Sequence, residues 1–129
     1  MPDEAGPVRI ALTTVSSLDE GRRVARLLVE RRLAACINLI PNMTSIYRWR
    51  GGVEVASEVL MVIKTTADQI PALESAVREL HTYEAADQIP ALESAVRELH
   101  TYEVPEFLTL DIESGSRPYL DWLLSSVEN

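Results

Sequence analysis

The chain has 129 residues with a net charge of −8. Of these residues 47% are hydrophobic and 25% charged, which is the composition of one soluble globular domain. The negative charge disfavours nucleic acid and anionic membrane surfaces as partners, because both attract clustered Lys and Arg. A single cysteine, Cys36, excludes an internal disulfide framework. The acidic start is unlike a signal peptide and no apolar run could span a bilayer, so we expect a cytoplasmic protein.

The first elements in chain order are a strand and a helix. Residues 8–14 form an apolar, β-branched run that predicts a strand. Ser17 and Glu20 have the spacing of a capping box, in which each side chain bonds the backbone amide of the other residue. Apolar residues at helical spacing follow, so we expect a helix over about 18–32.

The next segment predicts a long hairpin. Residues 36–40 and 44–49 are typical of strands, and Pro41–Asn42 between them favours a bulge, a bend or an edge. Arg50–Gly52 favours the turn, because its two glycines accept positive φ at little cost. Residues 53–65 predict the returning strand.

A verbatim repeat follows the hairpin. Residues 67–84 and 86–103 both have the sequence ADQIPALESAVRELHTYE, with Ala85 as the joint and an offset of 19. The flanking residues do not repeat, which indicates a duplication within an ordinary domain rather than a solenoid. We therefore expect a single domain over 1–129 with a 19-residue duplicated insertion within 67–103.

Each copy predicts a helix. In the first copy Asp68 is the expected N-cap, and Pro71 is tolerated in the first turn. One apolar stripe follows, made of Ile70, Leu73, Ala76, Val77 and Leu80. A straight fusion of the two copies is disfavoured, because an offset of 19 turns the second stripe by about 100° and places Pro90 mid-helix. We expect a break near Ala85–Asp87.

Only one copy is expected to take the native position of the second helix. The other copy then forms an appended loop or partial helix, or packs between protomers. The first copy keeps the native entry, Lys64–Thr66, whereas the second keeps the native exit, His100–Glu106. The sequence favours neither copy strongly. We expect the second copy to be the seated one, that is, the copy that packs on the sheet as the second helix.

The last elements complete a known topology. Residues 107–112 alternate as a strand, and Ser116 is the expected cap of a short helix with Pro118 near its start. Without one copy the order is β-α-β-β-α-β plus a C-terminal helix. This order predicts an α+β, ferredoxin-like split β-α-β sandwich, with two helices on one face of an antiparallel sheet.

The long hairpin predicts oligomerisation. The middle of its second strand, residues 59–63, is continuously apolar, which indicates burial on both faces. A strand pair that projects beyond its sheet does not bury its own apolar surface. We therefore expect other protomers to cover it.

Five separated motifs resemble the CutA family of divalent-cation tolerance proteins, and the resemblance covers about residues 8–126. The motifs are Leu33–Asn38, Ser45–Gly51, Lys64–Thr65, His100–Glu106 and Tyr119–Trp122. The resemblance implies a ferredoxin-like protomer, a tight trimer and a fold shared with PII signalling proteins. It also implies a role in tolerance of copper and other divalent cations, without an established enzymatic activity, and we expect no enzyme.

The resemblance also indicates where a metal would bind. In some members, ligands have been proposed at a cysteine of the first strand and at two adjacent histidines. Here Thr13 replaces that cysteine, and Leu80 or Leu99 replaces the first histidine. A tight copper(I) site is therefore not expected, because Cu(I) prefers thiolate or several imidazoles. We expect a weak Cu²⁺ or Zn²⁺ site that is not required for folding.

The candidate ligands near the inter-subunit cleft are His100, Tyr102, Glu103 and Glu106, with Cys36 as a lesser candidate. Imidazole and carboxylate suit a borderline cation. The alternative for His100 is a histidine favoured by the dipole at a helix C-terminus. The alternative for Cys36 is a buried structural residue.

Tyr47 and Trp49 alternate with Arg48 and Arg50 near the hairpin turn. Interleaved aromatic and basic residues are compatible with nucleic-acid stacking, but two arginines on an acidic chain make that unfavourable. Aromatic residues are enriched in subunit interfaces. We expect a homotrimer interface here and in the C-terminal region around Tyr119 and Trp122.

Two functions follow. The first is a trimeric cytoplasmic protein of metal tolerance that binds divalent cations weakly. The alternative is a PII-like module that senses a small anionic metabolite in the clefts between subunits. In that case Lys64 and Arg50 matter more than His100.

Overall fold

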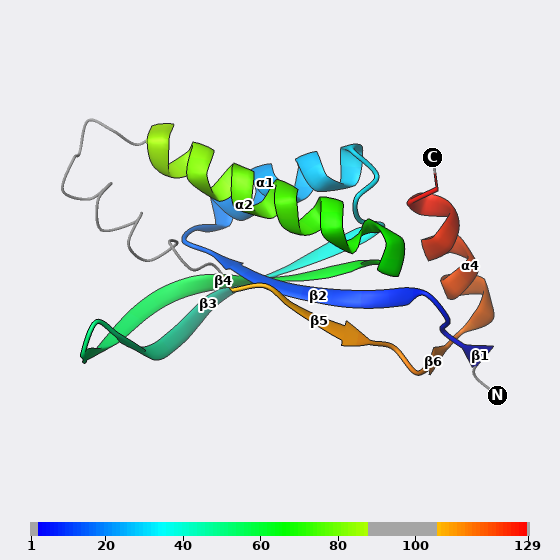
Figure 1. Cartoon of the computed structure of the whole chain (residues 1–129), viewed down its shortest axis with the longest axis horizontal. Coiled ribbons are helices and arrows are strands. Elements are labelled where there is room, and N and C mark those ends of the chain that lie inside the picture. The colour runs from blue at the N-terminus through cyan, green and yellow to red at the C-terminus, as the bar shows by residue number, and fades with distance from the viewer. Residues whose placement is uncertain (1–2, 88–105, 129) are drawn as a thin grey trace.

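The computed structural model describes residues 3–87 and 106–128, and side chains over 3–80 and 106–128. The chain forms two layers, an antiparallel sheet of order β3-β4-β2-β5 with α1 and α2 on one face (Figure 1). The elements are β2 (Val8–Val15), α1 (Leu18–Glu30), β3 (Cys36–Trp49), β4 (Gly52–Thr66), α2 (Ile70–Asp87), β5 (Leu108–Asp111) and α4 (Arg117–Ser126). This strand order confirms the predicted ferredoxin-like α+β fold.

The first helix follows its predicted start. The Ser17 hydroxyl accepts from the Glu20 amide at 3.1 Å, and the Glu20 carboxylate accepts from the Ser16 hydroxyl at 2.6 Å. The helix ends at Glu30 rather than Arg32, because Arg32 adopts a φ of 60°. The amide of Leu33 then donates to Leu28 O at 3.0 Å, which closes the helix in a Schellman motif.

The hairpin β3–β4 has the predicted interruption. Its register shifts between Ile40 and Met43, which marks a β-bulge or irregularity, and Asn42 there adopts a left-handed φ of 59°. The turn differs from the prediction in one residue, since Arg50 and Gly51, not the two glycines, have positive φ. The reason is the register: Gly52 pairs with Trp49, which leaves Arg50 and Gly51 as a two-residue turn.

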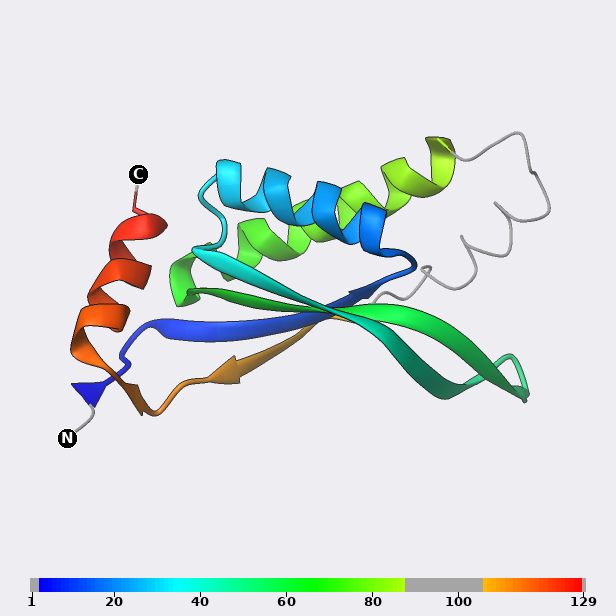
Figure 2. The same cartoon turned by 180° about the vertical axis from the view of Figure 1, so that it is seen from behind.

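Strand β4 is buried on one face only. Val59, Met61 and Ile63 are buried, whereas the intervening Leu60 and Val62 are half-buried. The prediction of burial on both faces is therefore wrong for the protomer. The physical reason is that α1 and α2 cover a single face of the sheet (Figure 2).

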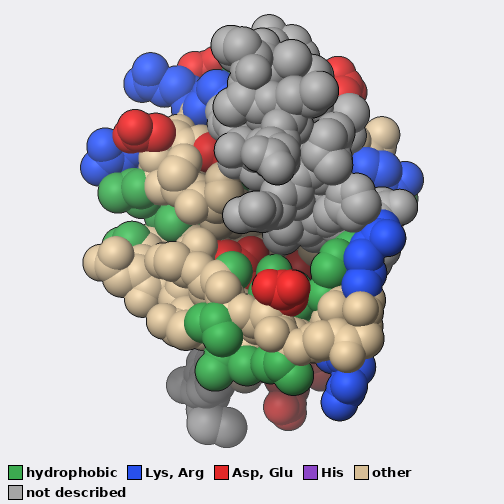
Figure 3. Space-filling model, turned by 90° about the vertical axis from the view of Figure 1, so that its left-hand side faces the viewer, with side chains coloured by type: hydrophobic (Ala, Val, Ile, Leu, Met, Phe, Trp, Pro, Cys, Tyr) green, Lys and Arg blue, Asp and Glu red, His purple; other side chains and the backbone are tan. Residues whose placement is uncertain are grey.

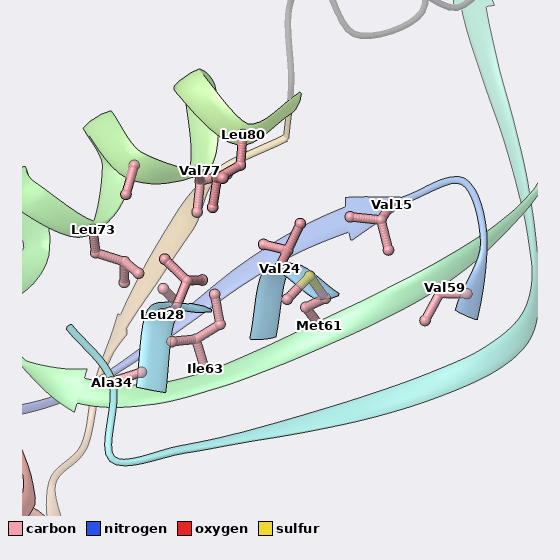
Figure 4. Close-up of a cluster of buried hydrophobic side chains, with 12 residues drawn as sticks. Val15, Val24, Leu28, Ala34, Val59, Met61, Ile63, Leu73, Val77 and Leu80 are labelled. Carbon is pink, nitrogen blue, oxygen red and sulfur yellow. The ribbon is translucent and has the colours of Figure 1, made fainter. Parts of the chain in front are cut away.

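The second helix is built from the first copy of the repeat. Its stripe, Leu73, Ala76, Val77 and Leu80, is buried against α1 and the sheet (Figure 4). The expectation that the second copy is seated is therefore wrong. Strand β4 leads into this helix through a short 3₁₀ turn, η1 (Ala67–Gln69), so the first copy reaches the sheet without any connecting loop.

The entry into α2 also differs from the predicted cap. Asp68 lies within η1, where its carboxylate accepts a hydrogen bond from the Thr66 hydroxyl, and the N-cap position before η1 belongs to Thr66. Pro71 lies in the first turn of α2 as predicted. The described part of α2 ends at Asp87, and the residues that follow lie outside the described part, so the break expected near Ala85–Asp87 stays a prediction.

The last helix, α4, closes the end of the sheet near the N-terminus (Figure 2). Leu120, Leu123 and Val127 pack there with Ala5 and Val8 in a second apolar cluster. Arg117 contacts Asp121 and Asp3, each at 3.2 Å. The hydrogen bond to Asp121, and then that to Asp3, raises the pKa of Arg117.

Two short strands, β1 (Asp3–Glu4) and β6 (Ser114–Gly115), pair next to α4. Ser116 is the N-cap residue of α4 as predicted, but the Ser116 side chain makes no capping hydrogen bond.

Over residues 3–87 and 106–128, no helix is both long and apolar enough to cross a membrane.

Candidate functional site

Most of the predicted metal ligands lie outside the described residues: His100, Tyr102 and Glu103. Glu106 is described and is exposed, just before β5. Leu80, one of the two residues that the resemblance aligns with the first histidine, is buried in the core. A hydrophobic residue at that position therefore stabilises α2 against the sheet rather than facing solvent.

The structure does not bring Cys36 and Glu106 together within the protomer. Cys36 begins edge strand β3, whereas Glu106 precedes β5 at the opposite edge of the sheet. Three strand spacings alone separate these edges by ~14 Å. Among the described side chains, no three of His, Cys, Asp or Glu are grouped closely enough to hold a metal ion.

Cys36 lies instead beside a lysine. Directly opposite residues of two strands share a face, and Cys36 is opposite Lys64 of β4. The Lys64 ammonium lies 5.8 Å from the ring centroid of Tyr119, whose ring is 5.4 Å from that of Trp122. This corner therefore combines one cation, two aromatic rings and a half-buried thiol.

The sheet face opposite the helices, here called the open face, carries apolar side chains that the protomer leaves uncovered. Leu108 is 56% exposed and Leu110 49% exposed, both on β5. The register aligns Leu110 with Ile10 and Leu108 with Leu12. The open face consequently presents apolar rows from neighbouring strands, as a surface covered by another protein does.

The hairpin carries a second uncovered apolar patch. Ile46 is 70% exposed and Val53 and Val55 are each 66% exposed, and Ile46 lies directly opposite Val55. We call these three residues the hairpin patch. Figure 3 looks onto the hairpin end of the molecule and shows apolar side chains at this surface.

The aromatic residues that the sequence analysis singled out lie on the other face of the hairpin. Tyr47 and Trp49 are half-buried, and the Arg50 guanidinium lies 5.5 Å from the centroid of the Trp49 ring. The hairpin patch is not among the residues predicted from the sequence. The period-two alternation of Val53 and Val55 could have revealed it, because alternate residues of a strand share a face.

The fold and these surfaces define a class: a ferredoxin-like α+β protein with a projecting hairpin and an uncovered apolar sheet face. The family model described as CutA1 divalent ion tolerance protein matches residues 9–89 and 84–126. Each match contains one copy of the repeat. The chain belongs to the CutA1 family.

Related sequences agree over most of the chain. Protein CutA of Homo sapiens is 40% identical over 124 residues, which are 96% of this chain but 59% of the human protein. The chain thus spans less than two thirds of that relative. The divalent-cation tolerance protein CutA of Thermus thermophilus is 42% identical over 114 residues, covering 88% of this chain and 92% of that protein.

Solved structures agree as well. CutA from Synechococcus elongatus has a TM-score of 0.80 at 33% identity and covers 99% of this chain and 96% of its own. The divalent cation tolerance protein from T. thermophilus has a TM-score of 0.74 at 39% identity, and the match covers 92% of this chain and 97% of that protein. These structures confirm the mixed α+β fold.

Proposed function

We propose that this chain is a cytoplasmic homotrimer that acts in divalent-cation tolerance and binds Cu²⁺ or Zn²⁺ weakly, without enzymatic activity. The observation that carries the proposal is the family match over nearly the whole chain, together with a T. thermophilus relative that is named a divalent-cation tolerance protein. Copper, the trimer and the compartment are parts of the proposal.

The proposed metal site contains His100, Tyr102, Glu103 and Glu106. One imidazole and two carboxylates favour a borderline cation such as Cu²⁺ or Zn²⁺. The site is weak because Leu99 and Thr13 supply no ligand where some relatives have histidine and cysteine. Cys36 is a separate, lesser candidate, since it lies at the opposite edge of the sheet from Glu106.

We also propose that the repeat is a tandem duplication of the second helix. The first copy forms η1 and most of α2, and the second family match contains the other copy. In this view the proposed ligand motif is complete only after the second copy, because Val104–Glu106 follows it once.

The proposed trimer interface combines the hairpin with the C-terminal region. The hairpin patch and the open face supply exposed apolar area, which favours association. Tyr47 and Trp49 on the hairpin and Tyr119 and Trp122 on α4 add aromatic contacts of the kind enriched in interfaces. Neighbouring protomers would thereby cover the half-buried side of β4.

Calorimetric titration with CuCl₂ tests the metal site. We expect weak binding by the wild-type chain and its loss in His100→Ala, because the imidazole is the only nitrogen ligand of the proposed site. His81→Ala is the matched control, since His81 holds the same place in the first copy. Equal binding by His100→Ala and the wild type would remove this site.

The corner around Lys64 favours a second candidate function, a PII-like module for a small anionic metabolite. The Lys64 ammonium next to the Tyr119 ring offers charge and a stacking surface. One solved relative, CutA from S. elongatus, is described as complexed with a Bis-Tris molecule. A thermal-shift screen separates the two functions, because a specific ligand raises the melting temperature by mass action. Shifts by metals alone would count against this candidate.

A further inference from the structure

We infer that the position of the second helix accepts either copy of the repeat, so that the chain has two alternative folded states. The helix slot is the apolar surface formed by Val24 and Leu28 of α1 and by Ala11, Met61 and Ile63 of the sheet. In the structure it holds residues 70–80. The proposed second occupant is residues 86–103 of the same chain.

The second copy offers the slot the same apolar side chains as the first. Every buried residue of the seated stripe has an identical counterpart 19 positions later: Leu92 for Leu73, Ala95 for Ala76, Val96 for Val77 and Leu99 for Leu80. The helix propensity and the apolar area removed from water are therefore the same for both copies. The core itself does not distinguish them.

Chain connectivity distinguishes them only weakly. With the first copy seated, the surplus residues lie between α2 and β5, whereas with the second copy seated they lie between β4 and the helix. The surplus is 19 residues in both states. Because the entropic cost of closing a loop depends on its length, this cost is nearly equal in the two states.

The entry to the helix is what favours the seating seen in the structure. The backbone amide of Ala67 donates to Pro7 O at 2.7 Å, and the side-chain Nε2 of Gln69 donates to Val127 O at 3.3 Å. The Thr66 hydroxyl donates to the Asp68 carboxylate. The second copy repeats Ala, Asp and Gln, but Ala85 replaces the preceding threonine. One lost hydrogen bond changes the population ratio by roughly 2- to 13-fold.

Three variants test the exchange: Leu73→Asp disables the first copy, Leu92→Asp disables the second, and the double variant disables both. We expect Leu92→Asp to melt like the wild type and Leu73→Asp to keep a cooperative transition lowered by less than about 15 °C. The double variant is expected to lose the transition, because a charged group is then the only occupant of a buried position.

Limited trypsin digestion read by mass spectrometry identifies the seated copy. Arg78 and Arg97 occupy equivalent positions of the two copies. In the wild type we expect slower cleavage after Arg78, and in Leu73→Asp slower cleavage after Arg97. The proposal is overturned if Leu73→Asp loses the transition as the double variant does, or if Arg78 stays the protected site in that variant.

Discussion

Two fully buried threonines differ in what their hydroxyl groups contact. Thr13 Oγ1 has no hydrogen-bond partner among the described residues, whereas Thr65 Oγ1 donates to Leu33 O at 2.7 Å. A buried polar group without a partner is destabilising, and a satisfied one is not. The Thr13 hydroxyl is therefore a destabilising group in this core.

We predict that Thr13→Val raises the free energy of unfolding by about 1 kcal/mol, because it replaces an unsatisfied hydroxyl with a methyl group of similar size. Thr65→Val is the matched control and is expected to lower it by about 1 kcal/mol, because Leu33 O loses its donor. Denaturant unfolding measures both. A loss of stability in Thr13→Val would mean that the hydroxyl has a partner.

Element by element, local sequence rules placed most boundaries. The first strand is predicted over 8–14 and spans Val8–Val15, and the bulge, bend or edge predicted at Pro41–Asn42 coincides with the register shift between Ile40 and Met43. The wrong predictions concern the burial of side chains by neighbouring elements. A continuous apolar run at 59–63 does not report that only one face of the sheet receives helices. Burial depends on the second layer, which a local pattern does not contain.

Helix capping provides the prediction at this scale. Ser17 accepts from the Glu20 amide at the start of α1, whereas Ser116 at the start of α4 makes no capping hydrogen bond. We expect Ser17→Ala to lower the free energy of unfolding by about 1 kcal/mol and Ser116→Ala to change it by less than about 0.5 kcal/mol. Guanidinium unfolding measures the stability of both variants. Equal losses of unfolding free energy would contradict the view that Ser17 caps its helix and Ser116 does not.

At the scale of the whole molecule, the described residues leave apolar side chains exposed at the hairpin patch and on the open face. The hairpin projects beyond its sheet, and its apolar residues are exposed in the described part of the chain, so they are available to another protein surface. Neighbouring protomers are the partners that this geometry fits best. The proposed trimer thereby explains why so much apolar area persists at a distance from the core.

We predict that Val55→Asp dissociates the proposed trimer, because it places a charge in the centre of the hairpin patch. Val29→Asp is the control, since Val29 is also exposed but lies on α1, away from the hairpin. Sedimentation velocity measures the mass of both variants. A Val55→Asp protein with the same mass as the wild type would place the interface elsewhere.

The candidate site was predictable only as a set of residues. The sequence placed His100, Tyr102, Glu103 and Glu106 in one short segment, so their proximity needs no tertiary information. Cys36 was different, because its distance from Glu106 depends on the strand order β3-β4-β2-β5. Sequence separation says nothing about which edges of a sheet two strands occupy.

The sequence by itself determined the elements, the caps and the two identical helical segments, because periodicity and turn chemistry act over a few residues. It left open which copy is seated, since both present the same stripe. Only the tertiary structure decided this: β4 leads directly into the first copy, and the entry contacts around Ala67 favour it. Contacts between distant segments depend on chain connectivity, and no local pattern encodes that.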